Sequence, residues 1–357
     1  MINNKTLFVV ASGSGGHILP ALILAKNWQK DNNGQVIFIT GIKDLDKNIL
    51  ENNNFINKII YFKLNNFPGK SLLKYPKFIW QFLVCFAKSY FLIKKYKKNN
   101  INNITVITTG GYLAIPVCLA AKKHKQEIIL HELNVVPGKA IKFLADLANK
   151  INIVFEQTRK YFFKKLNNKI FVTNYPLRYN LQDKIFDRQE LILKINNLNN
   201  INFNINNKTI LILGGSQGSV TLNNYFKDFI LQARDNNNLI NNTRDNLNIF
   251  INNNINLNNI NIIHQTGSQD SFNWENFYKD LNIPAIVFSY KQDLKDYYLI
   301  SDLVFARAGA GTLFELEFFG KKSFIFPLKT VYTSHQVDNA KIMVERNKGL
   351  FEFKQPF

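Results

Sequence analysis

A glycine-rich segment that ends in a histidine, SGSGGH at residues 12–17, lies between an apolar run at 7–11 and a helical pattern at about 20–30. Glycines let the backbone approach an anion closely, and the N–H groups at the start of a helix carry partial positive charge. The segment therefore predicts a phosphate-binding loop, and a merely tightly packed turn is the alternative. The GxGxxG fingerprint is missing and no obvious acidic residue closes the next strand at Thr40, so NAD binding is the less favoured interpretation.

His17 stands at the rim of this predicted loop. An imidazole at that position could remove a proton from a hydroxyl group at neutral pH. A histidine that only caps the neighbouring helix is equally compatible with the residue pattern. The residues alone leave both interpretations open.

Two more polar loops follow predicted strands in the first half of the chain. The sequence TGGY at 109–112 follows a strand at 104–108, and HELN at 131–134 follows a strand at 127–131. Open parallel sheets bind ligands at the carboxyl ends of their strands, so these loops should line one crevice. Glu132 and Asn134 could hydrogen-bond an acceptor there, or they could be buried polar caps.

The second half of the chain also has glycine-rich segments between a predicted strand and a predicted helix. They are LGGSQG at 213–218 and RAGAGTLFE at 307–315. In the latter segment, backbone N–H groups and the Thr312 hydroxyl can hold a diphosphate. Glu315, one turn inside the following helix, can accept two hydrogen bonds from a vicinal diol such as ribose. A first-turn carboxylate favoured by the helix dipole is the alternative for Glu315, but it does not account for the glycines.

Alternating β-branched runs and helical patterns must position these loops. In the first half the runs fall at 7–11, 36–40, 104–108 and 127–131, and after Pro176 they restart at 209–213, 261–264, 285–288, 303–306 and 323–327. Such alternation predicts an α/β fold with parallel sheets covered by helices. We expect two domains, residues 1–174 and 175–357. The asparagine-rich tracts at 196–208 and 236–261 should be loops.

The composition limits the class of protein. A chain of 357 residues with 46% hydrophobic residues can bury two cores, and its net charge of +20 favours phosphate-bearing partners. Cys85 and Cys118 have no CxxC spacing, which argues against a structural metal and for a reducing compartment. The N-terminal apolar run at 7–11 is too short for a signal-peptide core, and the longest apolar stretch, at 78–93, contains Lys88 and is too short for a membrane-spanning helix.

Taken in order, the motifs of this sequence resemble the MurG family of peptidoglycan N-acetylglucosaminyltransferases over essentially the whole chain. They are SGSGGHILPAL at 12–22, TGGYLAIP at 109–116, HELNVVPGKA at 131–140, VTNYPLR at 172–178, GGSQGS at 214–219, RAGAGTLFE at 307–315 and HQVDNA at 335–340. The resemblance implies a GT-B fold, in which two Rossmann-like domains with parallel sheets face a cleft, with the acceptor and membrane on the N-terminal side and UDP-N-acetylglucosamine held mainly by the C-terminal domain. It also implies an inverting hexosyltransferase that converts lipid I to lipid II in peptidoglycan synthesis, and so acts in cell-wall biogenesis, cell shape and cell division.

The resemblance further implies the roles of individual residues. His17 would be the general base that takes the proton from the 4-hydroxyl of the muramoyl unit. The residues expected to contact UDP-N-acetylglucosamine or the neighbouring acceptor diphosphate are Ser14, Gly15, Gly16, Asn134, Arg178, Ser216, Ala310, Gly311, Thr312, Leu313, Glu315 and Gln336. Lys291 lies near an expected main-chain contact to uracil. No DxD-like motif occurs in these loops, so we expect no metal and no cofactor, with helix N-termini and Arg178 stabilising the UDP leaving group.

The segment 67–98 mixes aromatic and apolar residues with lysines. The lysines are Lys70, Lys74, Lys77, Lys94, Lys95, Lys97 and Lys98. In the light of the resemblance, this mixture predicts peripheral attachment to the cytoplasmic leaflet of the inner membrane, where the undecaprenyl-pyrophosphoryl acceptor lipid I resides. An internal amphipathic helix with snorkelling lysines is the alternative interpretation.

Three other functions compete with this assignment. The family generally continues well beyond the segment around Gly349, whereas this sequence ends at Phe357, so a membrane-associated nucleotide-sugar-binding remnant with impaired turnover is one alternative. Another UDP-sugar enzyme of GT-B architecture, such as a UDP-N-acetylglucosamine 2-epimerase, should lack the combined set of motifs. Nucleic acid is not an expected partner, because zinc spacing, an RNP-like aromatic pair and a basic recognition helix are all missing from the sequence.

Overall fold

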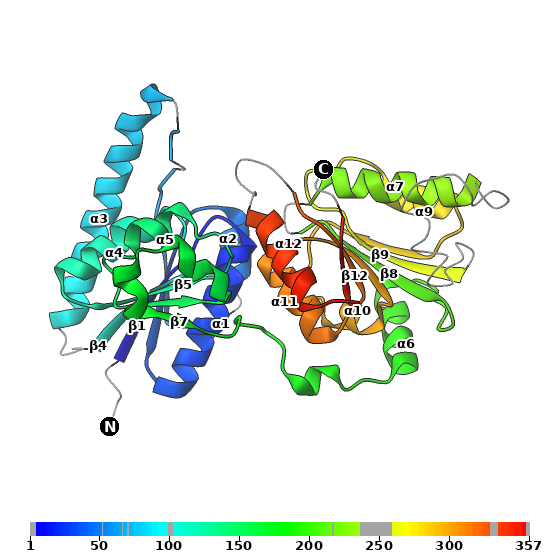
Figure 1. Ribbon diagram of the computed structural model, residues 1–357, viewed down its shortest axis with the longest axis horizontal. Coiled ribbons are helices and arrows are strands. Elements are labelled where there is room, and N and C mark those ends of the chain that lie inside the picture. The colour runs from blue at the N-terminus through cyan, green and yellow to red at the C-terminus, as the bar shows by residue number, and fades with distance from the viewer. Residues whose placement is uncertain are drawn as a thin grey trace. The chain divides into compact units, whose positions relative to one another are not determined.

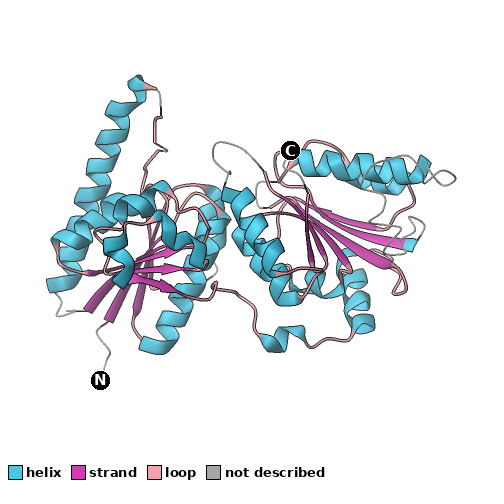
Figure 2. Ribbon diagram, in the orientation of Figure 1, coloured by secondary structure: helices cyan, strands magenta, loops and turns pink. Residues whose placement is uncertain are grey.

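The computed structural model describes residues 5–51, 53–65, 67–69, 71–98, 103–215, 218–235, 259–328 and 335–354. The chain divides into two compact units, Met1–Arg178 and Tyr179–Phe357, called unit 1 and unit 2 below. Each unit is built on one parallel sheet, with helices on both faces (Figures 1 and 2). The predicted α/β class with two Rossmann-like halves is confirmed. The cleft between the halves stays a prediction.

Unit 1 contains a seven-stranded sheet of order β3-β2-β1-β4-β5-β6-β7, parallel throughout. The strands are β1 Lys5–Val10, β2 Gln35–Thr40, β3 Lys58–Tyr61, β4 Asn103–Thr108, β5 Glu127–Glu132, β6 Lys150–Ile153 and β7 Ile170–Val172. The α-helices are α1 Gly15–Asn32, α2 Asp44–Leu50, α3 Tyr75–Lys98, α4 Ala114–Lys123 and α5 Lys139–Leu144, and short 3₁₀ helices include η1 Leu72–Lys74.

The central strands of unit 1 are apolar on both faces because helices cover both sides of the sheet. Alternate residues of β1 enter different cores: Phe8 and Val10 pack with α3, α4 and α5, whereas Leu7 and Val9 pack with α1 and α2. All four side chains are fully buried. This continuous apolar run is the reason why β1 could be recognised from the sequence.

Unit 2 contains a six-stranded parallel sheet of order β10-β9-β8-β11-β12-β13. The strands are β8 Lys208–Leu213, β9 Ile260–Gln265, β10 Ala285–Phe288, β11 Leu303–Arg307, β12 Ser323–Phe326 and β13 Phe351–Phe353. The α-helices are α6 Arg188–Asn199, α7 Val220–Asp235, α9 Trp274–Asp280, α10 Lys295–Ile300, α11 Ala310–Phe319 and α12 His335–Arg346. A cluster of aromatic rings that includes Phe226, Phe305 and Phe324 fills its core on the α7 side.

The prediction of loops in the asparagine-rich tracts is wrong in part. Helix α6 continues to Asn199, and the side chain of Asn196 both donates to and accepts from the backbone of Phe203. Asn261 lies within β9, where its buried amide bonds the backbone oxygen of Asn204. These asparagines replace water as partners of backbone groups, so they are part of the packed structure. Residues 236–258 lie outside the described residues.

In the described part of the chain, no helix is both long enough and apolar enough to cross a membrane. Within the same residues, no group of three or more His, Cys, Asp or Glu side chains is arranged to hold a metal ion. Cys85 and Cys118 are buried free thiols.

Candidate functional site

The first glycine-rich loop connects β1 to α1, and a buried carboxylate holds it in place. Both oxygens of Asp46 lie 3.3 Å from the Gly13 nitrogen, and the same side chain accepts hydrogen bonds from the Thr40 hydroxyl and the Gly41 N–H. Gly13 has a φ of +92°, which favours glycine. Asp46 therefore fixes the path of the backbone directly before the helix, a role that the sequence analysis missed.

Helix α1 starts at Gly15, several residues before the predicted start, because Ser14 serves as its N-cap in an extended conformation. The Ser14 side chain makes no capping hydrogen bond, and the first turn contains no acidic residue. The N–H groups of a first helical turn have no acceptor within the helix, and they form its positive end. Ser14, Gly15 and Gly16 thus form a helix N-terminus of the type that can receive an anion.

His17 is held by a reciprocal pair of hydrogen bonds to Thr109, the residue after β4. The ring Nδ1 lies 3.0 Å from the Thr109 carbonyl oxygen, and the Thr109 hydroxyl donates to the His17 carbonyl oxygen at 2.9 Å. Because a carbonyl oxygen can only accept, Nδ1 carries the proton and Nε2 keeps its lone pair. Desolvation lowers the pKa of His17, and the bond to Thr109 opposes this in part. A neutral imidazole with a basic Nε2 is what a general base requires.

The Thr109–Tyr112 loop brings the backbone close to this imidazole. Gly110 and Gly111 have φ angles of +108° and +86°. A Cβ atom at Gly110 would lie 3.6 Å from His17 Cε1 and 3.5 Å from the Ile141 side chain. The glycines therefore allow the loop to turn directly beside the histidine ring.

The third loop follows β5 and is organised by Glu132, which is buried and acts as a cap. Its carboxylate accepts hydrogen bonds from the backbone and side-chain nitrogens of Asn134 and from the Gly138 N–H. Desolvation raises the pKa of Glu132 to about 7, although these hydrogen bonds act in the opposite direction. The carbonyl oxygen of Asn134 also accepts from the Thr158 hydroxyl. Asn134 thus follows the carboxyl end of β5, and the neighbouring strand β4 is followed by Thr109, which holds His17.

In unit 2 the corresponding loops follow β8, β11 and β12, three neighbouring strands of the sheet. Gly215 and Gly218 have φ angles of +84° and +80°, and a Cβ atom at Gly218 would lie 2.4 Å from the Thr266 carbonyl oxygen. Arg307, at the end of β11, donates from Nη1 to the carbonyl oxygens of Gly214 and Gly218. Arg307 therefore connects the end of β11 to the loop after β8. The predicted contact Ser216 lies outside the described residues.

Helix α11 begins at Ala310, three residues after this arginine, with Gly309 as its N-cap and no acidic residue in its first turn. Leu313 is fully buried, and its N–H donates to the Gly309 carbonyl oxygen at 3.0 Å. Ala310 is nearly buried, which leaves mainly its main-chain N–H to face a ligand. Gly311 and Thr312 are partly exposed in the same turn. The four predicted residues therefore form one helix N-terminus, with the Thr312 hydroxyl as its side-chain donor.

Glu315 lies in the second turn of α11, where a buried tyrosine orients it. Its Oε2 accepts a hydrogen bond of 2.9 Å from the hydroxyl of Tyr298, a fully buried residue of α10. The Tyr298 ring stacks on Phe319 at a centroid distance of 5.2 Å. The carboxylate is therefore held in a defined direction.

The remaining predicted residues lie in three other places. Gln336, in the first turn of α12, is buried and accepts a hydrogen bond from the Leu328 N–H. Lys291 follows the edge strand β10, and its ammonium group lies 5.0 Å from the centre of the Tyr297 ring. Arg178 is the last residue of unit 1 and is partly buried.

Comparison with known proteins agrees with the motifs. The model of the glycosyltransferase family 28 N-terminal domain matches residues 7–153, and that of the C-terminal domain matches residues 209–355. The chain is 30% identical over 355 residues to a UDP-N-acetylglucosamine--N-acetylmuramyl-(pentapeptide) pyrophosphoryl-undecaprenol N-acetylglucosamine transferase of Thermodesulfovibrio yellowstonii, covering 95% of this chain and 83% of the relative. A Francisella philomiragia protein with the same name is 29% identical, with 98% and 84% covered.

Solved structures share the fold. The crystal structure of Acinetobacter baumannii MurG aligns with a TM-score of 0.63 at 22% identity, covering 98% of this chain and 86% of that one. A Neisseria meningitidis UDP-GlcNAc 2-epimerase bound to UDP-GlcNAc aligns at 0.58 and 13%, covering 93% and 85%. Two transferases of different organisms thus match in sequence, while the epimerase matches only in fold. The chain belongs to the family of UDP-N-acetylglucosamine--N-acetylmuramyl-(pentapeptide) pyrophosphoryl-undecaprenol N-acetylglucosamine transferases.

Proposed function

We propose that this protein transfers N-acetylglucosamine from UDP-N-acetylglucosamine to the 4-hydroxyl of the muramoyl unit of lipid I, which gives lipid II. The names of the relatives support the donor and the acceptor. The observation that carries the chemistry is the orientation of His17, whose Nδ1 bonds the Thr109 carbonyl oxygen and whose Nε2 is left as the base.

In this reaction His17 Nε2 takes the proton of the muramoyl 4-hydroxyl. The oxygen attacks the anomeric carbon of the donor sugar as the bond from that carbon to the UDP oxygen breaks, so the configuration inverts. Charge develops on the departing diphosphate, and preorganised N–H groups stabilise it. The N-terminus of α11 supplies such groups at Ala310, Gly311 and Thr312, and Arg178 adds a positive charge.

Binding is divided between the two units in this proposal. In unit 2, Glu315 accepts from the ribose hydroxyls, while Ser216, Lys291 and Gln336 complete the donor site. In unit 1, the N-terminus of α1 at Ser14–Gly16 receives the acceptor diphosphate, and Asn134 contacts the sugar beside His17. Neither set contains a group of acidic side chains suited to a metal ion, among the residues that are described.

We propose further that the protein attaches to the cytoplasmic leaflet of the inner membrane through η1 and the first half of α3. Leu72, Leu73 and Trp80 are exposed by 81%, 95% and 69%. In Figure 1 the N-terminal half of α3 extends beyond the rest of unit 1. Apolar side chains of this kind can enter the headgroup region while neighbouring lysines contact anionic lipid.

The test uses radiolabelled UDP-N-acetylglucosamine and a short-chain lipid I analogue, with identification of the product. We expect His17→Ala to lower kcat by roughly 10²- to 10⁴-fold and to leave donor affinity unchanged. His124→Gln is the matched control. His124 lies at the C-terminal end of α4, where its ring bonds the Tyr90 carbonyl oxygen, and it has no role in the proposed reaction. Normal turnover of the Ala variant would remove His17 from the mechanism, and formation of N-acetylmannosamine, still attached to UDP or free after hydrolysis, would indicate an epimerase instead.

A further inference from the structure

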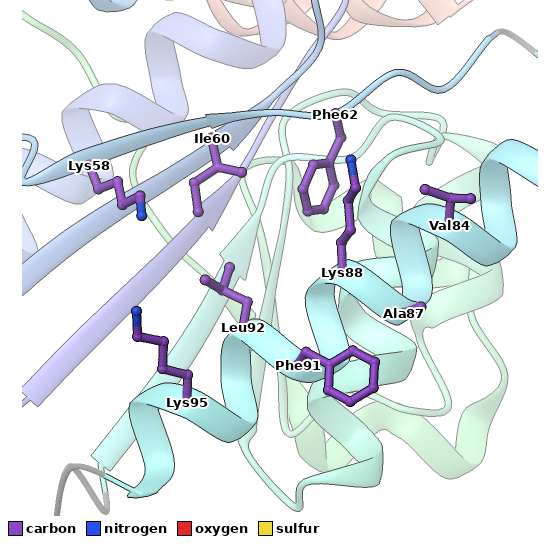
Figure 3. Close-up of a pocket in the computed structure, with 9 residues that line it drawn as sticks. All are labelled: Lys58, Ile60, Phe62, Val84, Ala87, Lys88, Phe91, Leu92 and Lys95. Atoms are coloured by element: carbon purple, nitrogen blue, oxygen red, sulfur yellow. The ribbon is translucent and has the colours of Figure 1, made fainter.

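An apolar groove runs along the edge of unit 1, away from the loops at the ends of the strands. Its walls come from β3 and from one face of α3, and its volume is about 590 Å³ (Figure 3). This volume falls within the range of about 300–1,000 Å³ that is usual for ligand sites. Ile60 and Phe62 form one side, and Val84, Phe91 and Leu92 form the other.

Three lysines surround this apolar surface. Lys58 comes from β3, and Lys88 and Lys95 lie two turns apart on the α3 face that lines the groove. In Figure 3 the side chains of Lys58 and Lys95 point toward one another from opposite walls. None of the residues that line the groove is acidic. Within the described part of the chain, these three lysines form no ion pair.

This combination selects the chemistry of the occupant. The apolar walls of the groove favour a hydrocarbon chain. The three lysine ammonium groups, which form no ion pair with the described residues, favour an anion at the border of the groove. A nucleotide would need polar groups along the walls. A second copy of this chain carries the same net charge of +20 and would bring more positive charge to the lysines. An amphiphile with an anionic head satisfies both parts of the groove.

We propose that the groove holds one acyl chain of an anionic phospholipid, with the phosphate bound by Lys58, Lys88 and Lys95. The lipid would be taken from the bilayer that the exposed part of α3 is proposed to contact. The site differs from general adsorption to a charged surface, because it predicts one lipid per protein and a requirement for both the chain and the phosphate.

The test measures binding of dihexanoyl phosphatidylglycerol, below its critical micelle concentration, by isothermal titration calorimetry. We expect one molecule to bind per protein, and dihexanoyl phosphatidylcholine to bind at least ten-fold more weakly. Glycerol 3-phosphate, which has the head without the chain, should show no measurable binding. Equal binding of glycerol 3-phosphate would mean an adventitious ion only and would overturn the proposal.

Two variants separate the parts of the site. Ala87 lines the groove and is exposed, so Ala87→Phe fills the groove without entering the core, and it should weaken phosphatidylglycerol binding at least ten-fold. Lys88→Gln with Lys95→Gln should reduce phosphatidylglycerol binding to the level of phosphatidylcholine. The matched control is Lys94→Gln, an exposed lysine of α3 outside the groove, which should bind normally.

Binding by the Ala87→Phe variant at the unmodified level, or an equal loss in the Lys94→Gln control, would refute the groove. Far-UV circular dichroism and thermal unfolding check that each variant is folded. Transfer of N-acetylglucosamine to a soluble acceptor is measured on the same preparations, and it should not change in any of them. A protein that binds the lipid but transfers no sugar would refute the proposed function and leave the groove intact.

Discussion

Removal of a single buried hydroxyl group tests how unit 2 recognises the donor. The Tyr298 hydroxyl donates to Glu315 Oε2 at 2.9 Å. A carboxylate oxygen has two lone pairs, so Oε2 can accept from this tyrosine and from a ribose hydroxyl together. The change Tyr298→Phe keeps the ring and its stacking on Phe319, and it removes only the hydrogen bond that directs the carboxylate.

The expected effect follows from the charge of the acceptor. A hydrogen bond to an ionised group contributes about 1.5–3 kcal/mol, and in the variant Glu315 recovers part of this free energy by rotating or by bonding water. We therefore expect UDP-N-acetylglucosamine to bind the Phe variant with about 1 kcal/mol less free energy, which is roughly a five-fold higher Kd. Calorimetric titration with the donor and with its 2′-deoxy and 3′-deoxy analogues measures this difference.

The analogues make the experiment specific. If Tyr298 acts through Glu315 and the ribose diol, the five-fold difference between the two proteins should shrink when a ribose hydroxyl is missing. Tyr278→Phe is the matched control, because Tyr278 is also buried in unit 2 but bonds His264 Nδ1 at 2.8 Å. It should lose stability without losing donor affinity. An equal loss of affinity for all donors, or the same loss in the control, would refute the reasoning.

Three further predictions concern the loops. Gly218→Ala should destabilise the protein more than Gly320→Ala, as measured by urea unfolding. Both glycines have positive φ, a conformation that costs an alanine about 1–2 kcal/mol. Only at Gly218 would the new Cβ also clash with a backbone oxygen, that of Thr266. The difference in unfolding free energy between the unmodified protein and Glu132→Gln should fall as the pH rises from about 4.5 through about 7, because the folded-state pKa of Glu132 lies above its unfolded value. The lowered pKa values of His17, His131 and His264 act in the opposite direction in both proteins, so their effect cancels from this difference. Because burial lowers the pKa of His17, the acidic limb of kcat/KM should lie below pH 6.5, and a limb above that value would contradict the assignment of this base.

The sequence predicted the central strands well because they are buried on both faces. The run at 209–213 differs from β8 by one residue, and the run at 104–108 differs from β4 by one residue. The short strands β3, β6, β7 and β13 were missed. Each has only three or four residues, and in β3, β6 and β13 a charged or polar residue shortens the apolar run further.

The candidate site could be predicted as a set of loops, but the contacts within it could not. Glycines marked three of the loops, at Gly13, at Gly110 and Gly111, and at Gly215 and Gly218, where positive φ angles favour this residue. The partners Asp46, Tyr298 and Arg307 left none, because the residues that they bond lie far away in the sequence or on another element. Only the tertiary structure distinguishes a buried cap such as Glu132 from a residue that faces a ligand.

The carboxylate of Asp46 has a consequence for inhibitors of this protein. The first loop already contains an anion of its own, since both Asp46 oxygens face the Gly13 N–H at 3.3 Å. A phosphate mimic placed against Gly13 would therefore meet like charge. Compounds aimed at this unit should instead place their negative group over Gly15 and Gly16. A cationic group has no clear place at Gly13 either, because the Lys43 ammonium group already donates to the Gly13 carbonyl oxygen at 3.4 Å.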